Sequence, residues 1–258
     1  MSPAIATSST NSEFNIGHPF IELQQIPSTN SYAIDNIQAN LAAPGTAYFA
    51  HAQTSGKGQR GKIWITEPGT NIILSVVLNT ACLSAYNKFP LSMTVALACY
   101  DFFNKYATED TTIKWPNDLY WRDRKAAGIL IENILRGETW PWAVAGMGMN
   151  INQTVFDPTT KNPVSLKQIT GNHFNTVEMA KELCVCLNNR YNQLLEGDNN
   201  SLLEEYNSKL YKYKQPVKLK KDNIVFNCII EGVSPLGDLL VSGAAQDRFV
   251  FGEVEWVI

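Results

Sequence analysis

Short polar turns join several apolar segments directly, with no helical stretch between them. Segments 111–115, 119–121 and 126–134 follow one another in this way, and segment 142–151 comes next. Strands joined by tight turns pair antiparallel, whereas parallel strands need a crossover of a dozen or more residues. The sequence therefore predicts a sheet dominated by hairpins. That indicates an α+β fold with a mixed sheet rather than a doubly wound nucleotide-binding fold.

Other segments complete this fold. Apolar runs predict strands at 20–25, 46–52 and 71–78, and helical periodicity predicts helices at 89–106, 176–195 and 201–210. The segment Pro27-Ser28-Thr29-Asn30 is typical of a turn and helix cap. Ser28 or Thr29 can cap a helix that runs to about Gln38.

The pattern changes near the C-terminus, where short strands and turns replace the longer elements. We expect a main domain over residues 20–212 and a small β-barrel over 213–258. Residues 1–19 begin with a stretch rich in Ser, Thr and Asn, and we interpret them as a disordered leader. A further folded domain needs roughly 50 residues or more, so the leader is too short for a DNA-binding domain.

Composition excludes several classes of function. The formal net charge is -3, so a general affinity for nucleic acid or anionic membranes is not expected. No apolar run has the roughly 18 residues that a membrane span needs, and no secretory signal is visible, so we expect a cytoplasmic protein. The five cysteines contain no C-x-x-C pair and the three histidines are scattered. Neither a zinc site nor a serine hydrolase is therefore favoured.

The segment 53–62, QTSGKGQRGK, alternates glycines with three cations. Glycine lets backbone N–H groups approach an anion, and the cations would neutralise it. The segment is neither a Walker P-loop nor a true dinucleotide fingerprint, because no crossover helix follows it. It predicts either an anion-binding loop or a flexible basic loop, and a loop of this composition should be mobile without a ligand.

Three further motifs follow in order. They are K-W-P-N-D at 114–118, K-A-A-G-I-L-I-E at 125–132 and G-M-G-M-N-I-N at 146–152. Each has a plain structural interpretation as well: a polar turn, a hairpin lysine in solvent, and close sheet packing. Simple strand alternation places Lys125 and Ala127 on one face of the sheet and Ala126 and Gly128 on the other.

Taken together with P-S-T-N at 27–30, these motifs resemble those of the biotin protein ligase family over roughly Phe20 to Ile258. The resemblance implies a catalytic domain related to class II aminoacyl-tRNA synthetases and an SH3-like C-terminal barrel. It also implies a reaction in two steps. ATP, with Mg²⁺, converts biotin to biotinyl-5'-adenylate and pyrophosphate, and the biotin then passes to a lysine of a biotin carboxyl carrier protein. A monomer or homodimer that does not bind DNA or membranes is expected.

The resemblance also implies roles for individual residues. Those expected to bind biotin are Ser28, Thr29, Asn30, Gln53, Gly56, Lys57, Gly58, Gln59, Lys125, Gly128, Leu130 and Gly148. Those expected on the ATP side are Arg60, Trp64, Lys114, Asn117 and Asn150. The expected catalytic residues are Lys125, Lys57 and Asp118. Lys125 would meet the biotin carboxylate and the α-phosphate, and Asp118 would orient or deprotonate the acceptor lysine.

Two features keep alternatives open. Many family members have Arg where this chain has Gln59, and a neutral amide offers no charge to a phosphate. Retention of the adenylate is therefore in question. A lipoate or octanoate ligase shares the architecture, and a biotin-binding protein without catalysis would share the pocket.

Overall fold

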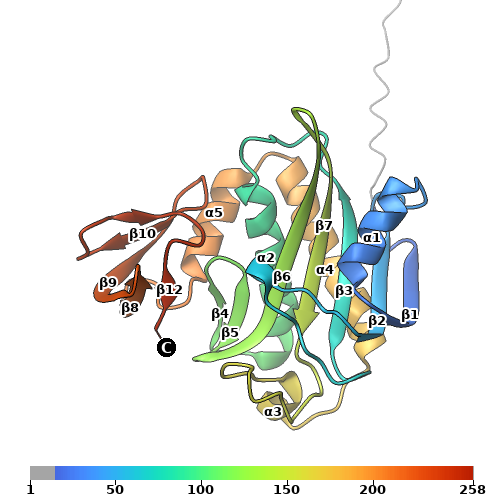
Figure 1. Cartoon of the computed structure of the whole chain (residues 1–258), viewed down its shortest axis with the longest axis horizontal. Coiled ribbons are helices and arrows are strands. Elements are labelled where there is room, and N and C mark those ends of the chain that lie inside the picture. The colour runs from blue at the N-terminus through green and yellow to red at the C-terminus, as the bar shows by residue number, and fades with distance from the viewer. Residues whose placement is uncertain (1–14, 258) are drawn as a thin grey trace, which may run out of the picture.

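The computed structural model describes residues 15–257 and contains a seven-stranded sheet with helices on both faces and a second, smaller sheet (Figure 1). The strands of the large sheet are β1 (Phe20–Ile26), β2 (Ala47–Gln53), β3 (Ile72–Asn79), β4 (Thr111–Lys114), β5 (Asp118–Trp121), β6 (Arg124–Arg136) and β7 (Thr139–Met149). Their order is β1-β2-β3-β7-β6-β5-β4. Only β1 and β2 pair in parallel, and all other neighbours are antiparallel. The predicted α+β fold is confirmed.

The two faces of this sheet are covered differently. The helices are α1 (Thr29–Gln38), α2 (Phe89–Ala107), α3 (Leu166–Thr170), α4 (Thr176–Leu195) and α5 (Asn199–Ser208). On β3, Leu74 and Val76 join the large core cluster beneath α2 and α4, whereas Val77 packs against Ala33 and Ile37 of α1. Figure 1 shows α2 and α4 behind the strands. None of the helices within residues 15–257 combines the length and apolarity needed to cross a bilayer.

Helix α1 begins where the sequence predicts. Ser28 is its N-cap, and the Ser28 side chain accepts a hydrogen bond from Ser31 N. This cap buries Thr29 and Asn30 in the first turn, against the sheet. Helix α3 was not predicted, because five residues are too few to show a periodicity. A reciprocal capping box of Ser165 and Gln168 starts it.

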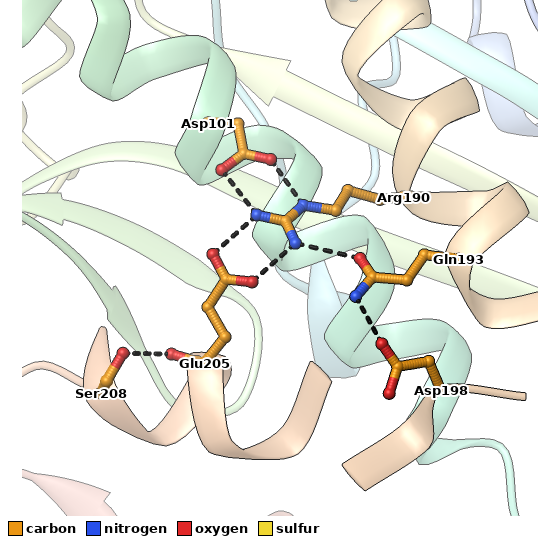
Figure 2. A network of polar contacts seen from close by, with 6 residues as sticks. All are labelled: Asp101, Arg190, Gln193, Asp198, Glu205 and Ser208. Carbon is orange, nitrogen blue, oxygen red and sulfur yellow. Dashed lines mark hydrogen bonds and ion pairs between the residues drawn. The ribbon is translucent and has the colours of Figure 1, made fainter. Parts of the chain in front are cut away.

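Three helices are joined by the largely buried guanidinium of Arg190 (Figure 2). Arg190 of α4 donates to both carboxylate oxygens of Asp101 on α2, at 2.6 and 3.0 Å. It also donates to both oxygens of Glu205 on α5, at 2.6 and 2.7 Å. Hydrogen bonds to Asp101 raise the pKa of Arg190, and the Arg190 contact lowers the pKa of Glu205. This cation is fully matched by negative charge.

The C-terminal part is a five-stranded antiparallel sheet, ordered β11-β10-β9-β8-β12. Its strands are β8 (Pro216–Lys221), β9 (Ile224–Val233), β10 (Leu239–Ser242), β11 (Arg248–Phe249) and β12 (Glu255–Trp256). Leu219, Ile230 and Phe249 belong to the same hydrophobic cluster as the large sheet. The expected β-rich C-terminal region is therefore present. A domain boundary near residue 212 stays a prediction, because one core spans both sheets.

Ordered structure begins before Phe20, although the sequence predicted that it would begin at Phe20. Ile16 is 3% exposed and belongs to the core, and its backbone N–H donates to Asn188 Oδ1 at 3.0 Å. Gly17 N donates to Gly45 O at 2.8 Å. The rest of the predicted leader, residues 1–14, lies outside the described residues.

Candidate active site

The residues of the predicted site lie around one cleft of about 1080 Å³. Its walls are the first turn of α1, the loop after β2, strands β3 to β7, the segment 156–163 and the last turns of the C-terminal sheet. Figure 1 shows the loop after β2 crossing in front of β6 and β7. All of the residues predicted to bind biotin or ATP or to take part in catalysis line this cleft, except Gly56.

Uncharged polar side chains line one end of the cleft. Gln53 Oε1 accepts from the backbone N–H of Thr29 at 2.7 Å and from its hydroxyl at 3.1 Å. The Ser75 hydroxyl lies 2.6 Å from Asn30 Oδ1 and 2.7 Å from Thr29 Oγ1. Asn30 Nδ2 donates to Leu130 O at 3.2 Å. These side chains hold one another in fixed orientations, which suits recognition of a neutral polar group.

Three residues outside the predicted binding set contribute to this end. Ser75 is fully buried, and the signal was a lone hydroxyl within the apolar run NIILSVVL. Glu132 closes the quoted K-A-A-G-I-L-I-E motif, and its Oε2 accepts from Asn30 Nδ2 at 2.8 Å. Gly146 leaves the space that the Asn30 amide fills, because a Cβ there would collide with Asn30 Oδ1. Only the folded sheet brings these residues together.

Lys125 lies at the centre of the cleft. Its Nζ donates to Asp118 Oδ1 at 2.7 Å, and both side chains are largely buried. The predicted strand alternation is wrong here. Leu119 pairs with Ala127 but Tyr120 pairs with Lys125, so Ala126 is the extra residue of a β-bulge.

The bulge turns Lys125 to the same face as Gly128. A Cβ at Gly128 would lie 3.5 Å from Lys125 Nζ. Asp118 is paired with Gly128 across the ladder and therefore faces the same side. The bulge thus aims the lysine at the carboxylate and at the cleft, and the interpretation of Lys125 as a solvent-facing hairpin lysine is excluded.

Trp64 lies across the two glycine-containing strands. A Cβ at Gly148 would come within 2.5 Å of its indole ring, and one at Gly128 within 3.1 Å. Lys125 Nζ is 5.7 Å from the ring centroid. The indole Nε1 is buried and has no hydrogen-bond partner in the described chain. The two glycines therefore permit an aromatic side chain to approach the sheet closely.

The glycine-rich loop is a small hairpin. Lys57 and Ile63 form an isolated bridge, and Gly58 N donates to Lys62 O at 2.7 Å. Gly56 lies at the base, where a Cβ would collide with the carbonyl of Trp64. Gly56 thus supports the hairpin instead of lining the cleft.

The hairpin reaches the C-terminal sheet at its tip. Arg60 has a left-handed φ of 57°, and its Nη1 donates to Gly252 O at 3.1 Å. Gln59 beside it lines the cleft. On the other arm, Lys57 is half exposed and its Nζ is 3.9 Å from Glu132 Oε1. The loop thus contacts the large sheet through Lys57 and the C-terminal part through Arg60.

The two predicted asparagines of the ATP side hold backbone in place. Asn117 Nδ2 donates to Ile129 O at 2.8 Å. Asn150 Nδ2 lies 3.2 Å from Val164 O and 3.3 Å from Lys125 O. Both line the cleft, and both fix segments that carry other site residues.

Lys114, the last residue of β4, also lines the cleft. It is 9% exposed, and within residues 15–257 its Nζ has no hydrogen bond or ion pair. The rings of Tyr120 and Trp256 lie 4.9 and 5.2 Å from Nζ. Burial, and then the nearby charges of Lys125 and Lys62, lower the pKa of Lys114 to about 8, against an opposing effect of Asp118.

The cleft has the chemical features of an anion-handling site. None of its lining residues is a cysteine, and the described residues contain no group of three His, Cys, Asp or Glu side chains that could hold a metal ion. The arrangement can place a carboxylate and a phosphate beside the ammonium group of Lys125.

Solved structures share this fold. The biotin protein ligase from Aquifex aeolicus in complex with biotin and ATP has a TM-score of 0.77 and 23% identity, over 92% of this chain and 97% of that chain. The biotin protein ligase from Leishmania major in complex with biotinyl-5-AMP has a TM-score of 0.57 and 19% identity, over 90% and 98% of the two chains.

Sequence comparison gives the family. Residues 22–150, half of the chain, match the model of the biotin/lipoate A/B protein ligase family, and the chain belongs to this family. The bifunctional ligase/repressor BirA of Escherichia coli is 36% identical over 135 residues, which are 52% of this chain and only 40% of that relative. A biotin–[acetyl-CoA-carboxylase] ligase of Paracoccus denitrificans is 26% identical over 83% of this chain and 93% of its own length.

Proposed function

We propose that this protein is a biotin protein ligase. It activates biotin with ATP to biotinyl-5'-adenylate and pyrophosphate, and then transfers the biotin to a lysine of a biotin carboxyl carrier protein. The Paracoccus relative, which matches over most of both chains, carries the name of such a ligase.

This proposal rests on the order in which polar, apolar and charged side chains follow one another along the cleft. The hydrogen-bonded cluster of Thr29, Asn30, Gln53 and Ser75 forms a neutral polar end. The apolar side chains of Leu130 and Ile73 line the wall on the same face of the sheet, and Lys125 lies farther along β6, away from Asn30. Biotin has the same order of groups: a neutral ureido ring, an apolar bicycle and chain, and a carboxylate that must meet the phosphates of ATP.

Lys125 would serve the first step. The biotin carboxylate attacks the α-phosphorus, a C–O–P linkage forms, and the bond to the β-phosphate oxygen breaks to release pyrophosphate. Both reactants are anionic, and charge accumulates on the phosphoryl oxygens. The Lys125 ammonium, aimed into the cleft by the bulge, would draw the two anions together and stabilise that charge.

Asp118 would serve the second step. The acceptor amine must lose a proton as it attacks the acyl carbon and AMP leaves. The Asp118 carboxylate lies 2.7 Å from Lys125 Nζ and so faces the atoms that react. It can orient the incoming ammonium and accept its proton.

Mg²⁺ would accompany the nucleotide. The described residues offer no ready group of three ligands for it, and Mg²⁺ is commonly held by substrate phosphates and water with one or two carboxylates. When bound, it would neutralise phosphate charge. The expectations of a monomer or homodimer, of no DNA binding and of a cytoplasmic location remain predictions.

The test is ATP–pyrophosphate exchange with radiolabelled pyrophosphate, measured with biotin, lipoate, octanoate or no acid. We expect exchange with biotin alone, followed by transfer of biotin to a carrier domain. Exchange with lipoate instead would assign the protein to the lipoate branch of the family. Biotin binding without exchange would identify a binding protein that lacks catalysis.

A further inference from the structure

Two aromatic rings from different parts of the protein lie close to the ammonium group of Lys114. Tyr120 comes from β5 in the large sheet, and Trp256 comes from β12 in the C-terminal sheet. Asp118 pairs with Lys114 in the β4–β5 ladder, yet its carboxylate bonds to Lys125 instead. Lys114 therefore points into the cleft without a carboxylate of its own.

This arrangement leaves an excess of positive charge at one end of the cleft. The charges of Lys125 and Lys62 act on Lys114, and only Asp118 opposes them. A buried cation without a partner is costly, so the site favours a ligand that supplies negative charge. The triphosphate of ATP has several charges to offer, whereas biotin has only one.

Trp256 fixes the position of this lysine in two ways. Its ring covers the ammonium at 5.2 Å, and its Nε1 donates to Trp115 O at 3.2 Å, on the residue that follows Lys114. Trp115 Nε1 in turn donates to Gly237 O at 2.9 Å. Both indoles thus tie the end of β4 to the C-terminal sheet.

We propose that Trp256 is a positioning residue that holds Lys114 against the β- and γ-phosphates of ATP, so that the C-terminal sheet sets the affinity for the pyrophosphate end of the nucleotide. This rests on the proposed function. Lys114 binds the phosphates, and Trp256 acts through Lys114.

The experiment compares Trp256→Leu with Trp256→Phe in the full-length protein. Leucine keeps apolar bulk but lacks the ring that attracts a cation, whereas phenylalanine keeps the aromatic face. Trp121→Leu is the matched control, because Trp121 stacks with Arg122 at 4.4 Å and does not line the cleft. For each protein, exchange kinetics give the KM for ATP, pyrophosphate and biotin.

For Trp256→Leu we expect the KM for ATP and for pyrophosphate to rise roughly tenfold, as for the loss of a desolvated cation–π contact. The KM for biotin and the affinity for biotinol-adenylate, a stable analogue without the pyrophosphate group, should stay within about twofold. Trp256→Phe should recover part of the ATP affinity, because phenylalanine keeps an aromatic ring but lacks the Nε1 hydrogen bond to Trp115 O. Trp121→Leu should match the parent.

A pH profile separates positioning from general damage. The groups that face Lys114 are Asp118, Tyr120, Lys125 and Lys62, besides Trp256. Leucine removes a ring that favours the ammonium but keeps most of the burial, so the pKa of Lys114 should fall further. The rise of the ATP KM at alkaline pH should therefore begin at a lower pH in Trp256→Leu than in the parent.

The outcomes are distinct. If the parent catalyses biotin-dependent exchange and the KM for ATP is unchanged in Trp256→Leu, this inference is overturned and the proposed function stands. Equal losses for ATP, pyrophosphate and biotinol-adenylate would also overturn it, because a merely structural tryptophan would act that way. A parent without biotin-dependent exchange would remove the proposed function and this inference with it.

Discussion

Arg190 and Lys114 are both largely buried cations, one in the helical layer and one in the cleft. Arg190 has two carboxylates within 3.0 Å, from Asp101 and Glu205. Lys114 forms no ion pair within the described chain; two aromatic rings lie close to its ammonium, and the charges of Asp118, Lys125 and Lys62 act on it from farther away. The helical layer thus pairs its buried cation with carboxylates, whereas the cleft leaves Lys114 without an ion pair.

This difference distinguishes a buried charge that stabilises the fold from one that serves ligand binding. A paired cation contributes to the fold, because its removal would leave carboxylates without a partner. An unmatched cation lowers the stability of the folded state, so its presence indicates a ligand that completes it. Substitutions in both regions and a pH profile test that distinction.

Lys125→Ala should reduce biotin-dependent exchange by roughly a hundredfold to a thousandfold, equivalent to about 3–4 kcal/mol of transition-state stabilisation. Biotin binding should largely persist, because the polar end of the cleft lies elsewhere. Arg122→Ala is the control, since Arg122 is exposed at the hairpin turn. Exchange kinetics and calorimetric biotin titration measure both. Exchange within a few-fold of the parent would show that Lys125 is not catalytic.

Arg190→Met should lower the free energy of unfolding by about 2 kcal/mol, less than for a fully buried pair because its carboxylate partners are about one-third exposed. Exchange at a temperature where the variant is folded should equal that of the parent. Lys181→Met on the same helix, which breaks an exposed pair with Glu178, should have almost no effect. Denaturant titration gives the values. An equal loss in both variants would remove the contrast on which the comparison rests.

The pH dependence of ATP binding should report Lys114. Its pKa is lowered to about 8, so the ATP KM should rise as pH passes through about 8 and the charge is lost. The sign for stability is opposite. Between about 8 and the ordinary value of 10.5 the unfolded chain holds more protons, so this group favours folding more as pH rises. In Lys114→Arg the alkaline rise should disappear. A flat ATP KM from pH 7 to 9.5 in the parent would refute this.

Gln59→Arg should slow escape of the adenylate by about twofold to fivefold, as expected for one exposed ion pair. Gln59 lines the cleft at the tip of the loop hairpin, where a guanidinium could reach a phosphate. A chase of preformed adenylate gives the rate. Gln59→Met, of similar length without charge, should behave as the parent does. A faster escape from the arginine variant would contradict this position for Gln59.

The sequence predicts those parts of the site that depend on local chemistry. The cap at Ser28 starts α1 and buries Thr29 and Asn30 as expected. The motifs at 53–62, 114–118 and 125–132 all reach one cleft. Turns, caps and apolar runs depend on near neighbours in the chain, so their signals are visible before folding.

What was missed depends on long-range packing. The bulge at Ala126 reverses the predicted face of Lys125, and a single extra residue in a ladder leaves no periodic signal. Trp256 is far from Lys114 in sequence and meets it only through the second sheet. Asp118 pairs with Lys125 and not with its ladder neighbour Lys114, and this choice of partner is likewise a property of the assembled fold.

Lys114→Met separates the effect of this lysine on stability from its effect on ligand binding, because methionine keeps an apolar side chain of similar length and removes the charge. The measurement is the free energy of unfolding of the variant, with its affinity for ATP determined in the same preparation. We expect unchanged or higher stability together with a clear loss of ATP affinity, since a buried cation without an ion pair destabilises the fold and serves the ligand. A variant that is less stable than the parent and binds ATP equally well would contradict it.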